Sequence, residues 1–436
     1  MKSLDEMLNA PGTATDKKLT LPTRSYLFLL LFLLPVDYFA PSAAVLREAG
    51  AKPAIPLMVA ASFFFFFQER RRYLLGMDAE SFRIYRLLLS IVVLGSLAFG
   101  LNLCFSWSFF GGGKDPFGQF LGQGVLFLFL PIIVVTHSEF FRRPGHVMYM
   151  IRILPGVTLL HLLGILLEAG GALSPVSLPL SLFRTAEDLA GRQPSGLMTE
   201  PSYVGAMAAM FGLSLMLIEK DRTMFRVCLG IVSMIVALLI GAKTIVPVAI
   251  AGVFGFMWQA RKRIFQAKTF FGLAVVSAVA VYVTINRAAL DVSENLSSAM
   301  RLGSTVLAIR LALHGYCLTG IGFGQFHFLY RPEFAPQYLL YSSEALDQFS
   351  RNAQSRASTY NLFARILVET GALGLGCFLA ALVGLFRLAR RHQLPSMQFG
   401  AILLAASIGF LMTQDPFCYP PLACGMALIL SGTRRS

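Results

Sequence analysis

Long apolar segments recur along the whole of this 436-residue chain, and they limit its fold more than any other feature of the sequence. Hydrophobic residues make up 56% of the chain and charged residues only 14%, whereas about a quarter of the residues in an ordinary soluble domain are charged. Since one helix needs about 20 apolar residues to cross a bilayer, this content fills about twelve spans. The sequence therefore predicts an all-α polytopic membrane protein and excludes a soluble enzyme.

The apolar segments and the charges between them divide the chain into tails, spans and loops. The predicted spans lie near residues 25–46, 54–67, 84–106, 119–136, 147–168, 200–218, 224–240, 244–259, 269–286, 360–386, 397–413 and 415–431. With a cytoplasmic N-terminus, the positive-inside rule is obeyed by the Lys and Arg clusters at 17–24, 70–72, 142–143, 220–226, 261–263, 387–391 and 434–435. The predicted order in a bacterial inner membrane is a cytoplasmic tail (1–24), spans 1–9 (25–286), a large periplasmic loop (287–359), spans 10–12 (360–431) and a cytoplasmic tail (432–436).

The predicted outer loop of residues 287–359 concentrates arginine on the side where the positive-inside rule does not expect it. The loop is also rich in Tyr, Phe, Leu and Gly, so we expect it to fold over the membrane face. Its arginines are Arg287, Arg301, Arg310, Arg331, Arg351 and Arg356. A guanidinium group binds phosphate oxygens in a bidentate way and stays charged at any accessible pH. These arginines therefore favour a phosphate or pyrophosphate ligand, and solvation of the loop surface is the alternative interpretation.

Two further segments place single charges at the starts of predicted helices. A second predicted outer loop, residues 169–199, carries Arg192. The segment 191–203 ends this loop and opens a helix, and Pro201 suits the first position of that helix. Glu200 then lies at the helix start, where the helix dipole stabilises the carboxylate. This favours charge pairing or the binding of a substrate hydroxyl. Lys243 lies at the mouth of a later span, and the structural alternatives are a capping role for Glu200 and a snorkelling role for Lys243.

The outer loop carries two arginines ahead of a glycine-rich turn. Arg301 and Arg310 are nine residues apart, and at about 100° per residue they point to opposite faces of one straight helix. At most one of them then faces a given pocket, and Arg310 is favoured because it is nearer to the turn at Gly320–Gly324. The glycines of that turn would allow a ligand to approach backbone amides closely.

The helix that re-enters the membrane after the loop carries two charged residues. Arg365 and Glu369 are spaced i, i+4, so their charges can neutralise each other. Ionisable groups inside a membrane are functional candidates, and a structural pair that orients the helix is the alternative. The six cysteines show neither a C-x-x-C pattern nor a Cys/His ligand spacing, so we expect no metal site and no disulfide framework.

Taken together and in this order, four short stretches resemble motifs of the O-antigen polymerase and O-antigen ligase superfamily of bacterial envelope glycan enzymes. They are Glu200-Pro-Ser202, Lys243-Thr244, Arg310 followed by Gly320-Ile-Gly-Phe-Gly324, and Tyr360-Asn361 through Glu369-Thr-Gly371. The resemblance covers residues 190–375. It implies a GT-C-like glycosyltransferase architecture, with transmembrane helices and one large periplasmic loop.

Membership would imply a metal-independent inverting glycosyltransferase that works on the periplasmic face and needs no cofactor. Its donor would be an undecaprenyl-diphosphate-linked oligosaccharide, and cationic side chains would stabilise the departing pyrophosphate. We expect catalytic roles for Glu200, Arg310 and Tyr360. The expected substrate-binding residues are Arg192, Lys243, Arg301, Arg351, Arg356 and Glu369. The lipid bilayer, a chain-length regulator and a flippase are candidate partners, and nucleic acid is not expected.

One position departs from the pattern of the superfamily. Its ligases usually carry a His before the Asn of the last motif, whereas Tyr360 occupies this position here. A tyrosine, with a pKa of about 10, is a poor general base, so the sequence favours polymerisation of lipid-linked repeat units. The alternatives are an O-antigen ligase that transfers glycan to lipid A core, and a non-enzymatic transporter or flippase of lipid-linked glycan.

Overall fold

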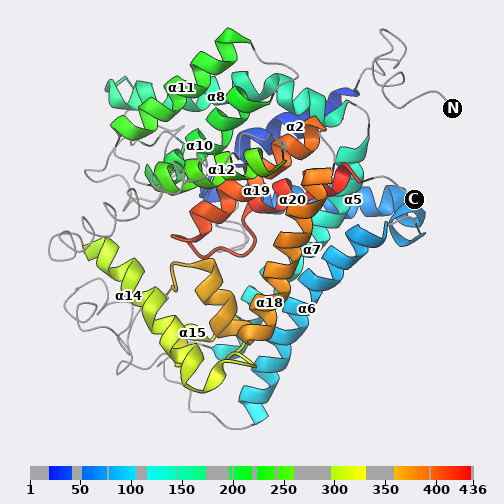
Figure 1. The fold of residues 1–436 in the computed structure, drawn as a ribbon, viewed down its shortest axis with the longest axis vertical. Coiled ribbons are helices and arrows are strands. Elements are labelled where there is room, and N and C mark those ends of the chain that lie inside the picture. The colour runs from blue at the N-terminus through cyan, green and yellow to red at the C-terminus, as the bar shows by residue number, and fades with distance from the viewer. Residues whose placement is uncertain are drawn as a thin grey trace.

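The computed structural model describes most of the chain, and every regular element in the described part is a helix (Figure 1). The described residues are 19–41, 52–75, 78–104, 115–143, 145–172, 195, 197–198, 201–218, 223–240, 244–259, 296–329, 358–391 and 394–433. Their helices are α2 (Leu21–Leu33), α5 (Ala54–Leu75), α6 (Ala79–Cys104), α7 (Pro116–Arg142), α8 (His146–Ala169), α10 (Pro201–Leu217), α11 (Met224–Leu239), α12 (Ile245–Gln259), α14 (Leu296–Leu311), η3 (Ala312–Tyr316), α15 (Phe326–Leu329), α18 (Leu362–Arg391), α19 (Pro395–Leu411) and α20 (Pro420–Ser431).

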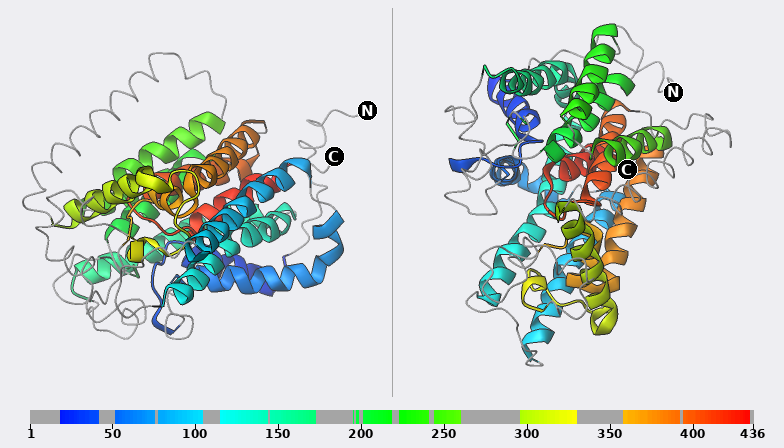
Figure 2. Two further views of the ribbon diagram at one scale, coloured as in Figure 1. Left: turned by 90° about the horizontal axis from the view of Figure 1, so that it is seen from below. Right: turned by 90° about the vertical axis from the view of Figure 1, so that its left-hand side faces the viewer.

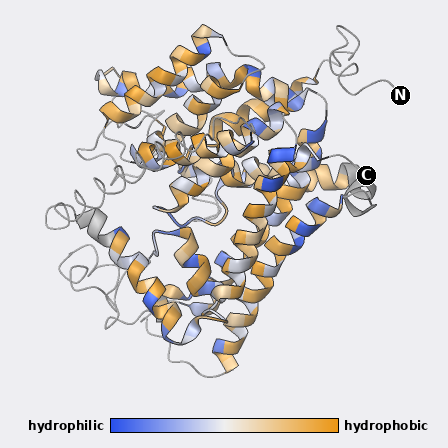
Figure 3. Cartoon of the chain, viewed as in Figure 1, coloured by the Kyte–Doolittle hydropathy of each residue, from blue (hydrophilic) through white to orange (hydrophobic). Residues whose placement is uncertain are grey.

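Four of the described helices, α6, α7, α8 and α18, are long and apolar enough to cross a membrane. Shorter apolar helices accompany them: α2, the Ala54–Phe67 part of α5, α10, α11, α12, α19 and α20. Apolar residues also cover much of the outside of these helices (Figure 3), and Leu97, Leu159 and Leu238 are 58%, 51% and 56% exposed. Such surface is unfavourable in water and suited to lipid. These features are those of a multi-pass helical membrane protein.

The predicted spans and the observed helices agree in position, with one correction. Each predicted span overlaps a helix except the ninth, 269–286, which lies outside the described residues. The extent of the first span was predicted wrongly, because α2 ends at Leu33 instead of continuing to residue 46. Pro35 follows two residues later, and proline lacks the backbone N–H that would continue the hydrogen bonds of the helix. The full number of membrane crossings stays a prediction.

The helices α10, α19 and α20 are buried along nearly all of their surface and form the centre of the bundle. Helices that are apolar all round belong inside a protein. Close backbone approach at their crossings depends on small residues: a Cβ added to Gly400 would lie 2.9 Å from the carbonyl oxygen of Gly425, and one added to Gly230 would lie 2.6 Å from that of Gly212. Contacts between small residues are typical of helix packing in membranes.

One end of the bundle is closed by a polar network around Arg142, the last residue of α7. Arg142 donates to the carboxylate of Glu139, and its Nη2 lies 3.2 Å from Oδ2 of Asp78. The same Nη2 donates to the Leu430 carbonyl at 3.2 Å and to the Thr433 hydroxyl at 3.1 Å. We call Asp78, Glu139, Arg142 and Thr433 the Arg142 cluster. It ties the start of α6 and the ends of α7 and α20 together.

The end of α18 and the start of α8 lie at this same end of the bundle. Arg391, at the end of α18, pairs with Glu80 in the first turn of α6 at 3.2 Å. Helix α8 begins directly after α7, since the His146 N–H donates to the Arg143 carbonyl. Several of the basic segments that the sequence assigns to the cytoplasm thus share one end of the protein. Which side of the membrane this end faces stays a prediction.

Residues 296–329 of the predicted outer loop are folded, and they lie at the opposite end. Asn102, near the end of α6, donates to the carbonyl of Ile321. Gln325 Nε2 donates to the carbonyl of Pro116, at the start of α7, at 3.0 Å. Figures 1 and 2 show this yellow part of the chain beside the end of α6. The rest of the predicted loop up to residue 357 lies outside the described residues.

Candidate functional site

The candidate site is built around a break in α18 at Gly371. This residue has φ 72° and ψ −178°, a conformation that residues with a side chain rarely adopt. The break separates a first limb, residues 362–370, from a second limb, residues 372–391, and Figure 1 shows that the two limbs do not share one axis. The Ala372 N–H, which the break removes from the helix, donates instead to the Cys317 carbonyl at 2.6 Å.

The turn Gly320–Gly324 docks directly onto this break. Its glycines have φ values of 73°, 95° and 70°, and the N–H groups of its second and third residues donate to the carbonyl oxygens of Val368 and Glu369 at 2.8 and 2.9 Å. A Cβ added to Gly320 would lie 2.6 Å from the backbone of Glu369. The expectation that this turn brings a ligand close to backbone amides was therefore wrong. An added Cβ on Gly322 or Gly324 would instead meet Phe99 of α6 or Gln119 of α7. The turn therefore lacks side chains because three helices approach it.

Glu369 is buried beside the break, and both of its carboxylate oxygens have partners. Oε1 accepts the Gly324 N–H at 3.0 Å, and Oε2 lies 3.2 Å from Nε of Arg365. The Glu369 side chain is 3% exposed and that of Arg365 is 13% exposed. The ion pair that the i, i+4 spacing predicts is thus present. Glu369 holds the glycine turn and Arg365 in a fixed relation to each other.

Arg365 extends this network to two other segments. Its Nη1 donates to the Asp415 carbonyl at 2.9 Å, and its Nη2 donates to Oε1 of Gln123 on α7 at 2.6 Å. The guanidinium carbon also lies 5.4 Å from the centre of the Phe127 ring, a distance typical of a cation–π contact. We call Gln123, Arg365, Glu369 and Asp415 the Arg365 cluster. It joins α7, α18 and the connection between α19 and α20.

The start of α18 is tied to the same connection. The Asp415 carboxylate accepts hydrogen bonds from the Ser358 hydroxyl at 2.7 Å and from the Thr359 N–H and hydroxyl at 3.0 and 2.9 Å. Asn361 caps α18, because its side-chain oxygen accepts the N–H groups two and three residues later at 2.9 and 3.1 Å. Its Nδ2 donates to the Met412 carbonyl at 3.0 Å. The cap therefore faces residues 412–419.

Residues 412–419, which we call the α19–α20 connection, begin at the exposed Met412, are half-buried over residues 413–416 and are buried from Phe417 to Tyr419. Helix α20 has 12 residues, which is a length of about 18 Å, and it ends at the Arg142 cluster. A bilayer core is about 30 Å thick, so a bilayer around the bundle would surround the connection. Phe417 stacks on Phe127 of α7 with ring centres 3.9 Å apart. Irregular backbone at this depth is tolerated only when it is buried in protein or lines a cavity.

A second polar group lies where α10 and α12 begin. Thr244 Oγ1 donates to the Ser202 carbonyl at 2.7 Å, which holds the two helix starts together. Lys52 Nζ donates to the Tyr203 hydroxyl at 3.0 Å and lies 4.8 Å from the centre of its ring. We call Lys52, Ser202, Tyr203 and Thr244 the Tyr203 cluster. The Tyr203 ring packs against Phe410 at 5.0 Å between ring centres, two residues before the α19–α20 connection.

Of the two arginines on α14, the structure places Arg301 beside Tyr360. The Arg301 guanidinium carbon is 5.9 Å from the centre of the Tyr360 ring, and Thr305 Oγ1 donates to the Thr359 carbonyl at 2.9 Å. Tyr360 itself has φ 49°, an uncommon value for a residue with a side chain. Arg310 lies on an exposed position nine residues later in the same helix. The preference for Arg310 over Arg301 therefore finds no support in the contacts to Tyr360.

The remaining predicted site residues lie outside the described residues. They are Arg192, Glu200, Lys243, Arg351 and Arg356. The described chain neighbours of two of them are in contact, because Pro201-Ser202 follows Glu200 and Thr244 follows Lys243. Within the described ranges, no group of three or more His, Cys, Asp or Glu side chains could hold a metal ion.

Sequence reasoning missed four residues that the structure brings into these two clusters: Gln123, Asp415, Lys52 and Tyr203. Two of them carried a readable signal. Gln123 is a polar residue inside a predicted span, and such residues are functional candidates. Asp415 precedes a proline between two apolar segments, a dipeptide that favours a turn. No local pattern distinguishes Lys52 or Tyr203. Comparison with known proteins adds no assignment, since no protein-family model and no curated protein matches the chain.

Proposed function

We propose that this protein joins undecaprenyl-diphosphate-linked oligosaccharide repeat units into a longer polysaccharide at the periplasmic face of a bacterial inner membrane. One observation carries the proposal: the α19–α20 connection and the turn of α19 before it contact both the Arg365 cluster and the start of α10. The stretches that resemble superfamily motifs are spread over residues 200–371. Described parts of them gather around a single segment, as the parts of one active site would.

The proposed reaction transfers a glycan from one lipid carrier to another. A hydroxyl oxygen of one lipid-linked repeat forms a bond to the anomeric carbon of a second glycan, and the bond from that carbon to the diphosphate oxygen breaks with inversion. The hydroxyl proton passes to a base that must be within hydrogen-bond reach, and Glu200 is the proposed residue. The diphosphate leaves with the bonding electron pair, and Arg301, Arg310 and Lys243 would stabilise its charge.

Substitution of the proposed base and of one proposed cation tests this function. In a strain that lacks the gene, Glu200→Gln and Arg301→Gln should each abolish high-molecular-weight polysaccharide while the amount of protein in the membrane is unchanged. The control is Arg83→Gln, because Arg83 is exposed on α6 and belongs to neither cluster. Single lipid-linked repeats should accumulate, whereas accumulation of unattached long polymer would support the ligase alternative. Normal polymer from both variants would refute the site.

The topology belongs to the same proposal. It comprises twelve membrane crossings, both termini in the cytoplasm, a GT-C-like architecture and an active face in the periplasm. Reporter fusions at residues 287–359 should report a periplasmic location, and fusions after the Arg142 cluster should report the cytoplasm. A cytoplasmic signal from the 287–359 fusions would overturn the proposed function, because the lipid-linked substrate would then face the wrong side.

A transporter or flippase of lipid-linked glycan is the second candidate, and the broken helices favour it. Transporters build substrate sites from discontinuous helices near the middle of the membrane, and the Gly371 break and the α19–α20 connection are interruptions of this kind. Purified protein in vesicles that carry lipid-linked oligosaccharide separates the two functions. The polymerase is supported if the protein also lengthens the oligosaccharide in detergent, where there is no membrane to transport it across. Movement across the vesicle membrane without lengthening supports the transporter.

A further inference from the structure

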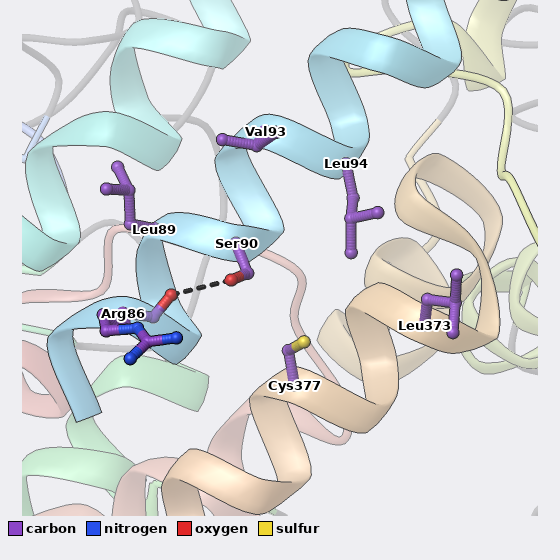
Figure 4. A pocket seen from close by; sticks show the side chains of 7 residues that line it. All are labelled: Arg86, Leu89, Ser90, Val93, Leu94, Leu373 and Cys377. Carbon is purple, nitrogen blue, oxygen red and sulfur yellow. Dashed lines mark hydrogen bonds between the residues drawn. The ribbon is translucent and has the colours of Figure 1, made fainter. Parts of the chain in front are cut away.

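A groove of about 500 Å³ runs between α6 and the second limb of α18, and no member of the Arg365 or Tyr203 cluster lines it. Figure 4 shows Arg86 at one end of the groove and Leu373 at the other. Between them the walls are mainly apolar, and Val93 and Leu373 are 50% and 57% exposed. An exposed apolar groove on the long helices of a membrane protein faces lipid chains, which fit its chemistry.

Arg86 places one positive charge in this otherwise apolar groove. Its guanidinium carbon lies 5.7 Å from the centre of the Phe82 ring, one turn earlier on α6, so the side chain runs back toward the start of the helix, as helix geometry favours. Arg86 is an exposed residue, and among the described residues no carboxylate forms an ion pair with it. The guanidinium group is therefore accessible to an anion from the lipid phase.

The position of Arg86 along α6 indicates the depth in the membrane at which such an anion would bind. Arg86 follows Glu80 by six residues, which is about 9 Å along the helix axis. Glu80 pairs with Arg391 at the end of the bundle that carries the Arg142 cluster. A long cationic side chain near a helix end reaches back to the membrane interface. Arg86 therefore presents its charge at the headgroup level of the adjacent leaflet.

We propose that this groove binds an anionic phospholipid from that leaflet, with the phosphate against Arg86 and one acyl chain along α6 toward Leu373. The orientation follows from the charge, because the lipid headgroup must lie at the cationic end and its chain must extend toward the middle of the bilayer. A lipid from the opposite leaflet would place its headgroup at the Leu373 end, where the groove is lined by apolar side chains and Cys377.

Retention of lipid by the purified full-length protein tests the proposal. The protein is incubated with mixed micelles that hold equal amounts of phosphatidylglycerol and phosphatidylcholine, and the bound lipids are counted by native mass spectrometry. Wild type should retain phosphatidylglycerol in preference, and Arg86→Gln should lower that preference about fivefold, as expected for one basic residue near the membrane surface. Val93→Trp, which fills the groove and keeps the charge, should lower retention of both lipids.

The matched control is Arg152→Gln. Arg152 is exposed on α8, six residues after His146, so it lies about as far along its own helix from the same end of the bundle, and it does not line the groove. This variant should bind phosphatidylglycerol as wild type does. The proposal is refuted if Arg86→Gln keeps the wild-type preference, or if Arg152→Gln loses as much, since the attraction would then be a general property of surface charge.

Discussion

Two partly buried arginine clusters contact α7 toward its opposite ends, and they hold very different kinds of backbone. The Arg142 cluster joins the ends of regular helices, with Arg142 between the carboxylates of Asp78 and Glu139. The Arg365 cluster joins irregular segments: the break in α18, the glycine turn and the α19–α20 connection. Arg365 pairs with one carboxylate, that of Glu369, and gives its other hydrogen bonds to an amide and a carbonyl oxygen.

The difference shows what each network does. The last carbonyl groups of a helix need hydrogen-bond partners, and a cation there is favourable because of the helix dipole. A structural role, holding the helix ends together, is therefore enough to explain the Arg142 cluster. Interrupted helices inside a membrane leave N–H and C=O groups without helical partners, which is costly in lipid. The Arg365 cluster supplies part of those partners. Continuous helices would need no such network, so the interruptions point to a site.

The largest expected effect concerns the Arg365–Glu369 pair. Arg365→Met should lower the free energy of unfolding by about 3–5 kcal/mol, because it leaves a buried carboxylate without its charge partner. The double variant Arg365→Met/Glu369→Met should regain part of this loss but form no polymer. Thermal unfolding in detergent and polysaccharide gels measure the two quantities. Normal polymer from the double variant would show that the Arg365–Glu369 pair has a structural role only.

The break in α18 gives the next largest effect. Gly371→Ala should destabilise the protein by about 1–3 kcal/mol, because φ 72° strains a residue with a side chain, and the added Cβ would also meet the Leu318 carbonyl. Gly376→Ala is the control in the second limb, where an added Cβ meets nothing within 4 Å. It should stabilise the helix by a few tenths to about 1 kcal/mol. Equal melting temperatures for the two variants would contradict a fixed break.

A conservative substitution in the Arg142 cluster should have a smaller effect on stability. Arg142→Lys keeps the charge but loses the forked geometry that reaches several acceptors at once, so we expect a loss of about 1.5 kcal/mol, comparable to one charged hydrogen bond. The polymer made per molecule of folded protein should not change. Shortened polymer at equal protein amounts would show that the Arg142 cluster also contributes to activity.

The smallest effect is a pH dependence at Asp78, which lies just before α6. Burial raises the pKa of this carboxyl, but hydrogen bonds from Ser81 and Thr433 and the charge of Arg142 together hold it below its usual 3.8. A lowered pKa contributes stability above the unfolded value, and this stability is lost as the pH falls through the folded value. The difference in melting temperature between wild type and Asp78→Asn should therefore be constant near neutral pH and shrink below about pH 4. A difference that persists in strong acid would contradict this assignment.

Part of the candidate site was predictable because it depends on local spacing. Arg365 and Glu369 are four residues apart on one helix, and the pair forms at 3.2 Å. Arg301 and Arg310 share α14, as their predicted placement on one helix requires. The choice between these two arginines was not predictable, because it depends on which of them approaches Tyr360 from a separate helix. The reason for the glycines at 320–324 was equally hidden, since each meets a different helix: Gly320 meets the backbone of α18, Gly322 meets Phe99 of α6 and Gly324 meets Gln119 of α7.

The sequence by itself determined that the chain is a bundle of apolar helices and where most of those helices lie. This is so because apolar length, proline positions and i, i+4 spacing act within a few turns of one helix. Only the tertiary structure decided which polar groups meet, since Arg365 finds Gln123 and Ile321 finds Asn102 more than 200 positions away. It also decided that the stretch predicted as two spans meeting at residue 414 contains an irregular connection of eight residues, 412–419. Local hydropathy does not show where one apolar helix ends and the next begins inside such a stretch.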